Sequence, residues 1–350
     1  MSVTTKQRDY LFDNYKVLLI LLVVIGHFIE PCYKNNDILF SLKWIIFSFH
    51  MPAFIFISGY FSKRELPFMT VVRKLAVPYI ACELIYYFFY VLVLHKDTGL
   101  YLTRPKFSLW YLLALFVWRA ATPYIKRIPH YMILAVIGGL LIGCSGMPSN
   151  FLSIPRILYF YPFFLAGINF NRETLTRLRT RSLRLVSALG LTAAALFAAF
   201  CPLLRVFTVK VFYGRYSYHT MGLNYAEGIL SRLLCYGISF AMTFAVMILI
   251  SERKTRYSYM GTRTMAVYLF HGLTYTFLKS CTPLLGNVDT VLETFLLLAC
   301  CVAVTVVFSA QPFTTFTNQF SNVPLPELPK PENIWRPNIY LQQVLCNVKV

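Results

Sequence analysis

The stretch YKVLLILLVVIGHFIEP, residues 15–31, is an apolar run that holds two widely spaced ionisable side chains, Lys16 and His27. Its length is close to the ~20 residues with which an α-helix crosses a lipid bilayer. A backbone in lipid must satisfy its own hydrogen bonds, and this favours a membrane-spanning helix here. The stretch therefore predicts an all-α integral membrane protein.

The rest of the chain repeats this pattern. Of its 350 residues 57% are hydrophobic and only 13% are charged, which is too apolar for a soluble globular protein. We expect about ten transmembrane helices in one bundle. The predicted spans are 15–30, 40–62, 75–94, 107–121, 131–145, 151–170, 185–204, 229–250, 265–280 and 291–311. The predicted division is a cytoplasmic N-terminus (1–14), a transmembrane domain (15–311) and a proline-rich cytoplasmic tail (312–350).

Lysine and arginine set the predicted orientation, because basic loops remain on the cytoplasmic side. Basic segments occur at 62–74, 126–130, 171–184 and 251–263, whereas the intervening loops 31–39, 145–150 and 281–290 are nearly free of these residues. Both termini are therefore predicted to be cytoplasmic, most simply in a bacterial inner (plasma) membrane. The net charge of +19 then indicates contact with anionic membrane lipids, and no nucleic acid is expected as a partner. No secretory signal is predicted, since residues 1–14 are polar.

The sequence also contains a long basic loop and nine cysteines, whose roles are less clearly indicated. The basic segment 205–222 lies in a longer outer loop, which is either a lid over an outer site or an amphipathic interfacial segment. The nine cysteines form no CxxC pair and lie mostly in apolar runs. They are typical of small core residues, and no metal site is expected.

Lys16 and His27 belong to one stripe of the first helix. Eleven residues at ~100° each return to within ~20° of the starting face, ~16 Å farther along the axis. Lysine at a span end is commonly a snorkelling anchor, but a histidine far inside a span normally faces a cavity or a partner. A neutral imidazole there can take a proton from a hydroxyl. A long anionic donor held by Lys16 would then present its reactive end to His27.

Other polar residues in the predicted spans are candidates for the same site. Charged or imidazole groups within spans need partners and often mark function. Aromatic and arginine side chains near span ends are alternatively an interfacial belt or snorkelling anchors. These candidates are His50, Glu83, Trp110, Tyr111, Arg156, Arg232 and His271. His50 precedes Met51-Pro52, a step that is expected to break the hydrogen-bond ladder of the helix locally.

A basic residue, ten residues and then a histidine in the first span resembles the membrane-bound acyltransferase 3 family. The segments DNYKVLLILLVVIGHFIEP, FHMPAFIFISGYFSKR, LWYLLALFVW and YLFHG resemble its fucose 4-O-acetylase-like branch, and the similarity covers residues 9–310. The resemblance implies a ten-helix O-acyltransferase that moves an acetyl group from cytoplasmic acetyl-CoA to a sugar hydroxyl. The acceptor would be a carbohydrate or lipid-linked glycan of the cell envelope, as in polysaccharide O-acetylation.

The resemblance places the catalytic pair on Lys16 and His27 and a further histidine on His271. Coenzyme A phosphates would bind Lys16, Arg73 and Lys74, with Lys63 and Arg64 as the other nearby cations. The family's R-x-x-R pattern has Thr70 in its first position here, before Arg73. Glu83 or His50 would orient a ring nitrogen or stabilise charge. His50, Trp110, Tyr111, Arg156 and Arg232 would bind the acceptor.

A transporter or flippase for a glycan or small metabolite is the alternative. It predicts two related halves with paired interrupted helices. The sequence has no such repeat, and the step at Met51-Pro52 has no counterpart.

Overall fold

A computed structural model describes residues 8–324 of the chain, which fold into helices without a β-strand in that range. The first half contains α1 (Tyr10–Phe28), α2 (Asp37–Tyr60), α3 (Phe68–Val71), α4 (Val77–Phe88), α5 (Trp110–Ile125), α6 (Tyr131–Leu141) and α7 (Ile154–Asn169). The second half contains α8 (Arg172–Leu178), α9 (Arg181–Phe200), α10 (Tyr225–Leu249), α11 (Thr264–Cys281), α12 (Val291–Phe308) and α13 (Gln311–Ser321). Two π-helical segments, Val72–Ala76 and Phe89–Val93, extend α3 and α4 into one long rod.

Six of these helical segments are long and apolar enough to cross a membrane. They are α1, α2, the rod Phe68–Val93, α9, α10 and α12. This confirms a multi-pass α-helical membrane protein. The other four predicted spans also fall on helices, namely α5, α6, α7 and α11, but these are shorter or less apolar. The count of about ten spans stays a prediction.

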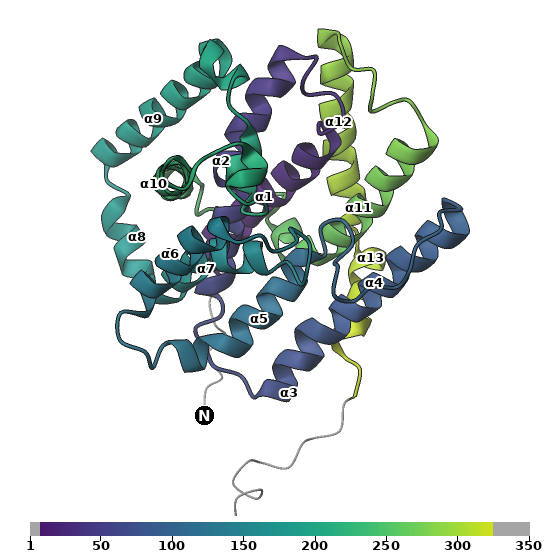
Figure 1. Cartoon of the computed structure of the whole chain (residues 1–350), viewed down its shortest axis with the longest axis horizontal. Coiled ribbons are helices and arrows are strands. Elements are labelled where there is room, and N and C mark those ends of the chain that lie inside the picture. The colour runs from purple at the N-terminus through teal and green to yellow at the C-terminus, as the bar shows by residue number, and fades with distance from the viewer. Residues whose placement is uncertain (1–7, 325–350) are drawn as a thin grey trace, which may run out of the picture.

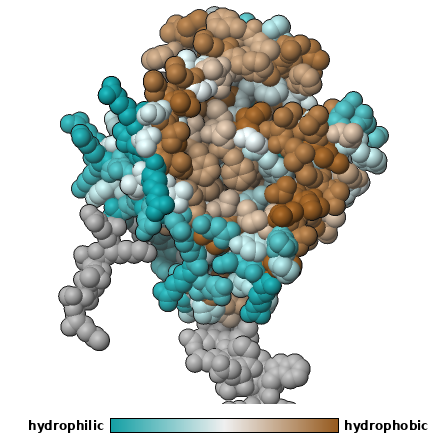
Figure 2. Space-filling view, turned by 90° about the vertical axis from the view of Figure 1, so that its left-hand side faces the viewer, coloured by the Kyte–Doolittle hydropathy of each residue, from teal (hydrophilic) through white to brown (hydrophobic). Residues whose placement is uncertain are grey.

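The arrangement separates a buried centre from a lipid-facing rim. Figure 1 shows α1 and α2 near the middle of the bundle, with α4, α9 and α12 toward its edge. In the apolar 18-residue segment of each helix, 61% of the residues of α1 are buried inside the protein but only 11% of those of α9. Figure 2 shows a broad hydrophobic area on one face, with hydrophilic residues along its lower and left margins. Such a large exposed apolar surface fits a bilayer, where it replaces contact with water.

Two helix ends differ from the prediction. Helix α1 begins at Tyr10 rather than residue 15, because the Asp9 side chain accepts a hydrogen bond from the Leu11 N–H and caps it. Lys16 therefore lies within α1, six residues after its start. The predicted tail from residue 312 begins with helix α13, which packs against α11 and α4. Residues 325–350 of that tail lie outside the described residues.

Helix α2 continues through Pro52, and the predicted break is limited to one bond of its hydrogen-bond ladder. Proline has no N–H and leaves the carbonyl four residues earlier, that of Ser48, without its helical donor. The Ser239 hydroxyl of α10 donates to that carbonyl at 2.6 Å. A neighbouring helix thus supplies the missing bond, as is common for prolines in membrane helices.

Helices α2 and α7 approach each other more closely than ordinary side chains permit. A Cβ atom on Gly59 would lie 2.0 Å from the Phe164 carbonyl oxygen, and one on Gly167 would lie 1.9 Å from that of Phe56. Small residues allow such backbone contact between helices in a membrane. This contact fixes α7, and with it Arg156, beside the α2 residue His50.

Candidate active site

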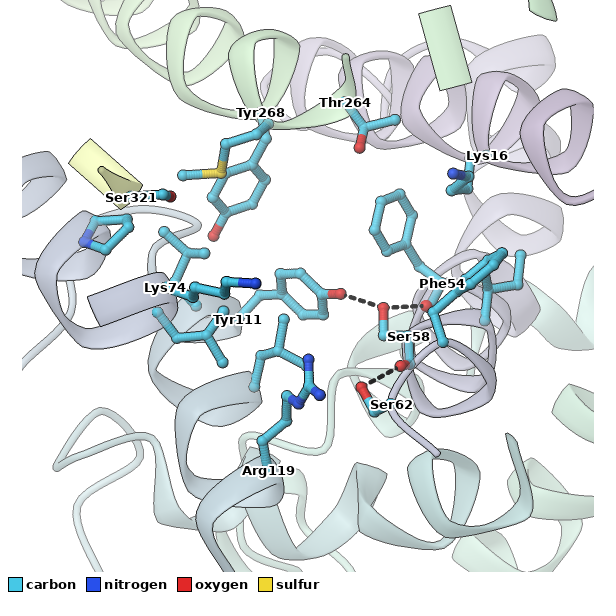
Figure 3. A pocket seen from close by; sticks show the side chains of 17 residues that line it. Lys16, Phe54, Ser58, Ser62, Lys74, Tyr111, Arg119, Thr264, Tyr268 and Ser321 are labelled. Atoms are coloured by element: carbon cyan, nitrogen blue, oxygen red, sulfur yellow. Dashed lines mark hydrogen bonds between the residues drawn. The ribbon is translucent and has the colours of Figure 1, made fainter. Parts of the chain in front are cut away.

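A cavity of about 380 Å³ opens among the starts of α1 and α11, the end of α2, the first ten residues of α5 and residues 74–78 of the rod. We call it the Lys16 cavity. Figure 3 shows Lys74 and Arg119 reaching into it, with Tyr111 and Tyr268 at its inner wall. Its polar lining consists of Lys16, Ser58, Ser62, Lys74, Tyr111, Arg119, Thr264, Tyr268 and Ser321. Lys16 is partly neutralised by Asp13, whose carboxylate lies 3.0 Å from the ammonium group.

A second cavity, of about 440 Å³, lies at the opposite ends of α1 and α11. We call it the Arg156 cavity. It is lined by His27, Glu30, Tyr90, Lys96, Pro105, Phe107, Asn150, Ser153, Arg156, Arg215, Tyr275, Thr276, Lys279 and Ser280. An adjoining pocket of about 140 Å³, the His50 pocket, shares His27, Glu30 and Arg156 with it and adds His50 and Trp110.

His27 lies where these spaces meet. It lines the Arg156 cavity, the His50 pocket and a narrow pocket of about 30 Å³ that also touches Phe54, Tyr111 and Tyr268. The last three side chains are also part of the Lys16 cavity wall. The narrow pocket therefore lies between the Lys16 cavity and His27, with these three side chains as the shared wall, and we call it the junction.

Aromatic rings and a second histidine surround His27. Its ring centroid lies 4.5 Å from that of Phe107 and 5.5 Å from that of His271. Among the described residues no side chain or carbonyl makes a hydrogen bond to the His27 ring. Part of this side chain is open to the cavities, so its nitrogens remain available for a substrate hydroxyl.

The tautomers of the other two histidines follow from their backbone partners. Nδ1 of His271 lies 2.8 Å from the Val267 carbonyl, and Nδ1 of His50 lies 2.7 Å from the Ile46 carbonyl. A carbonyl only accepts, so Nδ1–H donates in both cases and Nε2 carries a lone pair in the neutral ring. Nε2 of His271 is buried without a partner in the described part of the chain. His271 is thus a fixed acceptor beside His27.

A buried ion pair adjoins the site. Lys43 is 0% exposed, and its ammonium group contacts the Glu30 carboxylate and lies 4.1 Å from the centroid of the Phe47 ring. The Tyr213 hydroxyl donates to the same carboxylate at 3.3 Å. Glu30 thus joins α1, α2 and the outer loop directly beside the His27 turn.

The loop 201–224, which is predicted to lie on the outer side, contributes to the walls of the site, and this favours the lid interpretation over the interfacial one. Phe212 and Tyr213 line the His50 pocket, and Arg215 lines the Arg156 cavity. Burial raises the pKa of the Tyr213 phenol, so this group remains a neutral donor. Nε of Arg215 donates to the Ser149 hydroxyl at 3.2 Å, which fastens the loop to the segment before α7.

The structure brings most of the predicted residues to these spaces. Lys16, Lys74 and Tyr111 line the Lys16 cavity, and Tyr111 reaches the junction as well. His27, His50, Trp110 and Arg156 line the His50 pocket, and His271 packs beside His27.

Five predicted residues lie elsewhere. Glu83 accepts a hydrogen bond of 2.8 Å from the Lys106 N–H and lines none of the described cavities. Arg232 donates to the Gly139 and Tyr216 carbonyls at 2.7 and 2.9 Å, so it links α10 to α6 and the outer loop. Lys63 and Arg64 border a separate pocket of only about 20 Å³, and Arg73 borders none of the described cavities.

Several residues at the site escaped the sequence analysis. They are Glu30, Lys43, Lys96, Phe107, Arg119, Arg215, Tyr275 and Lys279. Lys43 carried a usable signal, because a lysine within a predicted span needs a partner. The others stand at span ends or in loops, where charge and aromatic residues are ordinary.

The comparisons with known proteins agree with this geometry. A family model described as an acyltransferase domain matches residues 9–310, which is most of the chain. The chain belongs to the acyltransferase 3 family. The resemblance inferred from Lys16, His27 and the flanking motifs is thereby confirmed. The matched residues include the whole lining of the Arg156 cavity and all of the lining of the Lys16 cavity except Ser321.

Two curated relatives carry the name nodulation protein NolL. The one from Sinorhizobium fredii is 28% identical over 209 residues, which are 53% of this chain and 56% of that protein. The one from Mesorhizobium japonicum is 40% identical over 65 residues, which are 18% of this chain and 17% of that protein. The chain thus spans little more than half the length of the first relative and much less of the second. No solved structure matches the chain significantly.

Proposed function

We propose that this acyltransferase 3 protein is a membrane-embedded O-acyltransferase. It moves an acetyl group from cytoplasmic acetyl-CoA to a sugar hydroxyl in a cell-surface or exported glycan. In this proposal α5, α6, α7 and α11 also cross the bilayer and complete a ten-helix bundle in a bacterial inner membrane. Both termini are cytoplasmic, so the Lys16 cavity opens inward and the Arg156 cavity opens outward.

The observation that carries the proposal is the position of His27 between two cavities from opposite ends of the bundle. A donor held in the Lys16 cavity and an acceptor held in the Arg156 cavity can meet only near this imidazole. Proximity of this kind lowers the barrier because the reacting groups are already positioned.

The donor end is suited to coenzyme A. Lys74 and Arg119 reach into the Lys16 cavity from two separate helical segments, Val72–Ala76 and α5, and Lys16 lies on a third segment, α1. Ammonium and guanidinium groups bind phosphates, lysine as a point charge and arginine in a bidentate manner. The extended arm that carries the thioester would pass Tyr111 and Tyr268 toward the junction.

The proposed chemistry gives a role to the imidazoles of His27 and His271. The acceptor oxygen attacks the thioester carbonyl carbon while His27 takes the hydroxyl proton. The carbon–sulfur bond breaks, the acetyl group stays on the sugar oxygen, and the proton passes from His27 to the coenzyme A thiolate. His271 offers the Nε2 lone pair beside His27 and stabilises the imidazolium during the transfer.

A glycan acceptor is supported by the motifs shared with the fucose 4-O-acetylase-like branch and by the polar lining of the Arg156 cavity. Carbohydrates present many hydroxyls, and serine, threonine, asparagine and charged side chains provide matching donors and acceptors.

The test is acetyl transfer from radiolabelled acetyl-CoA by the purified protein in lipid nanodiscs, with a glycan extract from cells that lack the gene. We expect His27→Ala to lower transfer by about 10²- to 10⁴-fold, the usual contribution of a positioned base. His219→Ala is the matched control, because His219 is exposed in the outer loop and lines none of the described cavities. Near-normal transfer by His27→Ala rejects the base. Movement of glycan across the membrane without acetylation supports a transporter instead.

A further inference from the structure

We propose that the acceptor is an anionic saccharide, whose carboxylate or phosphate binds the cations of the Arg156 cavity while a neighbouring hydroxyl reaches His27. This inference rests on the proposed function and names the chemical class of its acceptor.

Four cationic side chains converge on the Arg156 cavity from four separate segments. Lys96 lies just after the rod Phe68–Val93, and Arg156 lies in the first turn of α7. Arg215 lies in the loop 201–224, and Lys279 lies in the last turn of α11. Residues 145–150 and 281–290 on this side contain neither lysine nor arginine, but other loops hold further cations, namely Lys34, Arg104, Lys106, Arg205 and Lys210. None of these five lines the Arg156 cavity, so the four cations that line it are distinguished by their position.

These cations have no carboxylate partner among residues 8–324. Lys96 donates to the Ser280 hydroxyl at 2.8 Å, Arg215 donates to that of Ser149, and Arg156 lies 4.8 Å from the centroid of the Trp110 ring. Lys279 lies 5.7 Å from the centroid of the Tyr275 ring. On the opposite face of the protein, by contrast, Arg172 pairs with both Asp9 and Glu252.

The one carboxylate that lines the Arg156 cavity does not neutralise it. Glu30 contacts the ammonium group of Lys43, which is fully buried behind it, so this pair contributes little net charge. The start of α7 adds further positive character, since Asn150 and Ser153 line the cavity and a helix dipole is positive at its N-terminus. A cavity with this excess attracts an anion from water and concentrates it.

The position of the cations ties the anion to the reaction. Arg156 and His27 line both the Arg156 cavity and the His50 pocket. A volume of about 440 Å³ lies in the usual range for sites that bind small molecules. A charged sugar bound there places its charge on Arg156 and Arg215 and its ring within the same space as the His27 imidazole.

Binding can be measured without acyl transfer, through the thermal unfolding of the purified protein in nanodiscs. The probes are glucuronate, glucose 1-phosphate, inorganic phosphate and glucose, each titrated at low salt. We expect glucuronate or glucose 1-phosphate to stabilise the protein at concentrations where glucose and inorganic phosphate do not. A larger effect of glucuronate identifies a carboxylate, and a larger effect of glucose 1-phosphate identifies a phosphate.

The variants Arg215→Gln and Arg156→Gln should weaken the binding of the charged sugar roughly tenfold or more, since a hydrogen bond to a charged group is lost. Arg205→Gln is the matched control, because Arg205 lies in the same loop but pairs with exposed Asp37 and borders none of the described cavities. If Arg156→Gln fails to fold, Arg215→Gln alone decides.

Equal effects of charged and neutral sugars, including no effect of either, overturn the inference. Equal effects of inorganic phosphate and glucose 1-phosphate overturn it as well, because the site would then recognise an anion without a saccharide. Charged-sugar binding by a protein that transfers no acetyl group from acetyl-CoA supports the anion site but rejects the proposed function. Acetyl transfer by a protein that does not distinguish charged from neutral sugars rejects this inference alone. The two failures are therefore distinguishable.

Discussion

The Lys16 cavity and the Arg156 cavity are of similar size, about 380 and 440 Å³, and both contain cations, but they are built differently. In the Lys16 cavity, hydroxyl and aromatic side chains separate the cations, and Asp13 offsets one of them. In the Arg156 cavity, Glu30 is bound to Lys43, and the remaining charges are all positive. In the proposed function each end receives an anionic molecule, and the junction between the two cavities is where the two molecules react.

The largest effect is expected from closing the junction, because this separates the two cavities without touching either set of cations. Val23 lines the junction and the His50 pocket. We expect Val23→Phe to lower acetyl transfer by about 10²-fold or more, since a shift of about 1 Å in the reacting groups already costs this much. Binding of coenzyme A and of a charged sugar, measured by thermal unfolding, should persist.

Leu22→Phe is the control for this variant, since Leu22 is adjacent, partly exposed and absent from the described cavities. Overpacking alone costs typically 1–3 kcal/mol and would appear in the unfolding temperature of either variant. Normal transfer by Val23→Phe would show that the donor and acceptor meet by another route.

The second effect sharpens the role of the Lys16 cavity. Lys74 and Arg73 are neighbours in one π-helical segment, but only Lys74 lines the cavity. Loss of a charge-assisted hydrogen bond should raise the KM for acetyl-CoA roughly tenfold in Lys74→Gln and in Arg119→Gln. Arg73→Gln should change it little, and the acceptor KM should stay constant in all three. An equal effect of Arg73→Gln would contradict the assignment of the donor cavity.

The membrane architecture was largely predictable from the sequence, because apolar length and the distribution of basic residues report directly on lipid. Lys16 and His27 were identifiable for the same reason, as an imidazole deep in an apolar run is rarely without function. The continuity of α2 through Pro52 was not predictable. It depends on Ser239, which lies 187 positions later in the chain and supplies the missing donor.

The outer half of the site was also hidden from the sequence. Lys96, Arg215 and Lys279 lie in loops or at a helix end. A single cation is common at such positions, so its presence in the sequence does not indicate a binding site. Tertiary contacts bring these three residues to the cavity that Arg156 and His27 line, since Lys96 is held by Ser280 and Arg215 by Ser149. Glu83 was identifiable as a buried carboxylate, but its hydrogen bond to the Lys106 N–H and its place outside the described cavities were not predictable.

The third effect concerns the stability of the outer end. Removing one partner of a buried ion pair leaves the other uncompensated. Lys43 is fully buried, whereas the Glu30 side chain is 39% exposed. Glu30→Gln should therefore destabilise the protein more than Lys43→Met, by about 2 kcal/mol, because only the first leaves a buried charge alone. Thermal unfolding in nanodiscs measures the difference, and the opposite order would mean that Glu30 depends on Lys43 more than Lys43 depends on Glu30.

The smallest effect is expected at the wall between the Lys16 cavity and the junction. The Tyr111 and Ser58 hydroxyls lie 2.5 Å apart, and Ser58 is further held by the Phe54 carbonyl (Figure 3). Ser58→Ala removes a neutral hydrogen bond worth about 1 kcal/mol, so Tyr111 should occupy its position less strictly. We expect acetyl transfer to fall only a few-fold, with more acetyl-CoA lost to hydrolysis, because water enters the junction more easily.

Ser62→Ala is the matched control at this wall. Ser62, just beyond the end of α2, also lines the Lys16 cavity, but its hydroxyl donates to the Ser58 carbonyl and makes no hydrogen bond to Tyr111. The ratio of coenzyme A released to acetyl groups transferred separates the two variants. If that ratio rises for Ser58→Ala alone, Tyr111 is the element that keeps the two cavities apart until both substrates are bound. If it rises equally for both, the wall has no such role, and His27 is open to the donor side at all times.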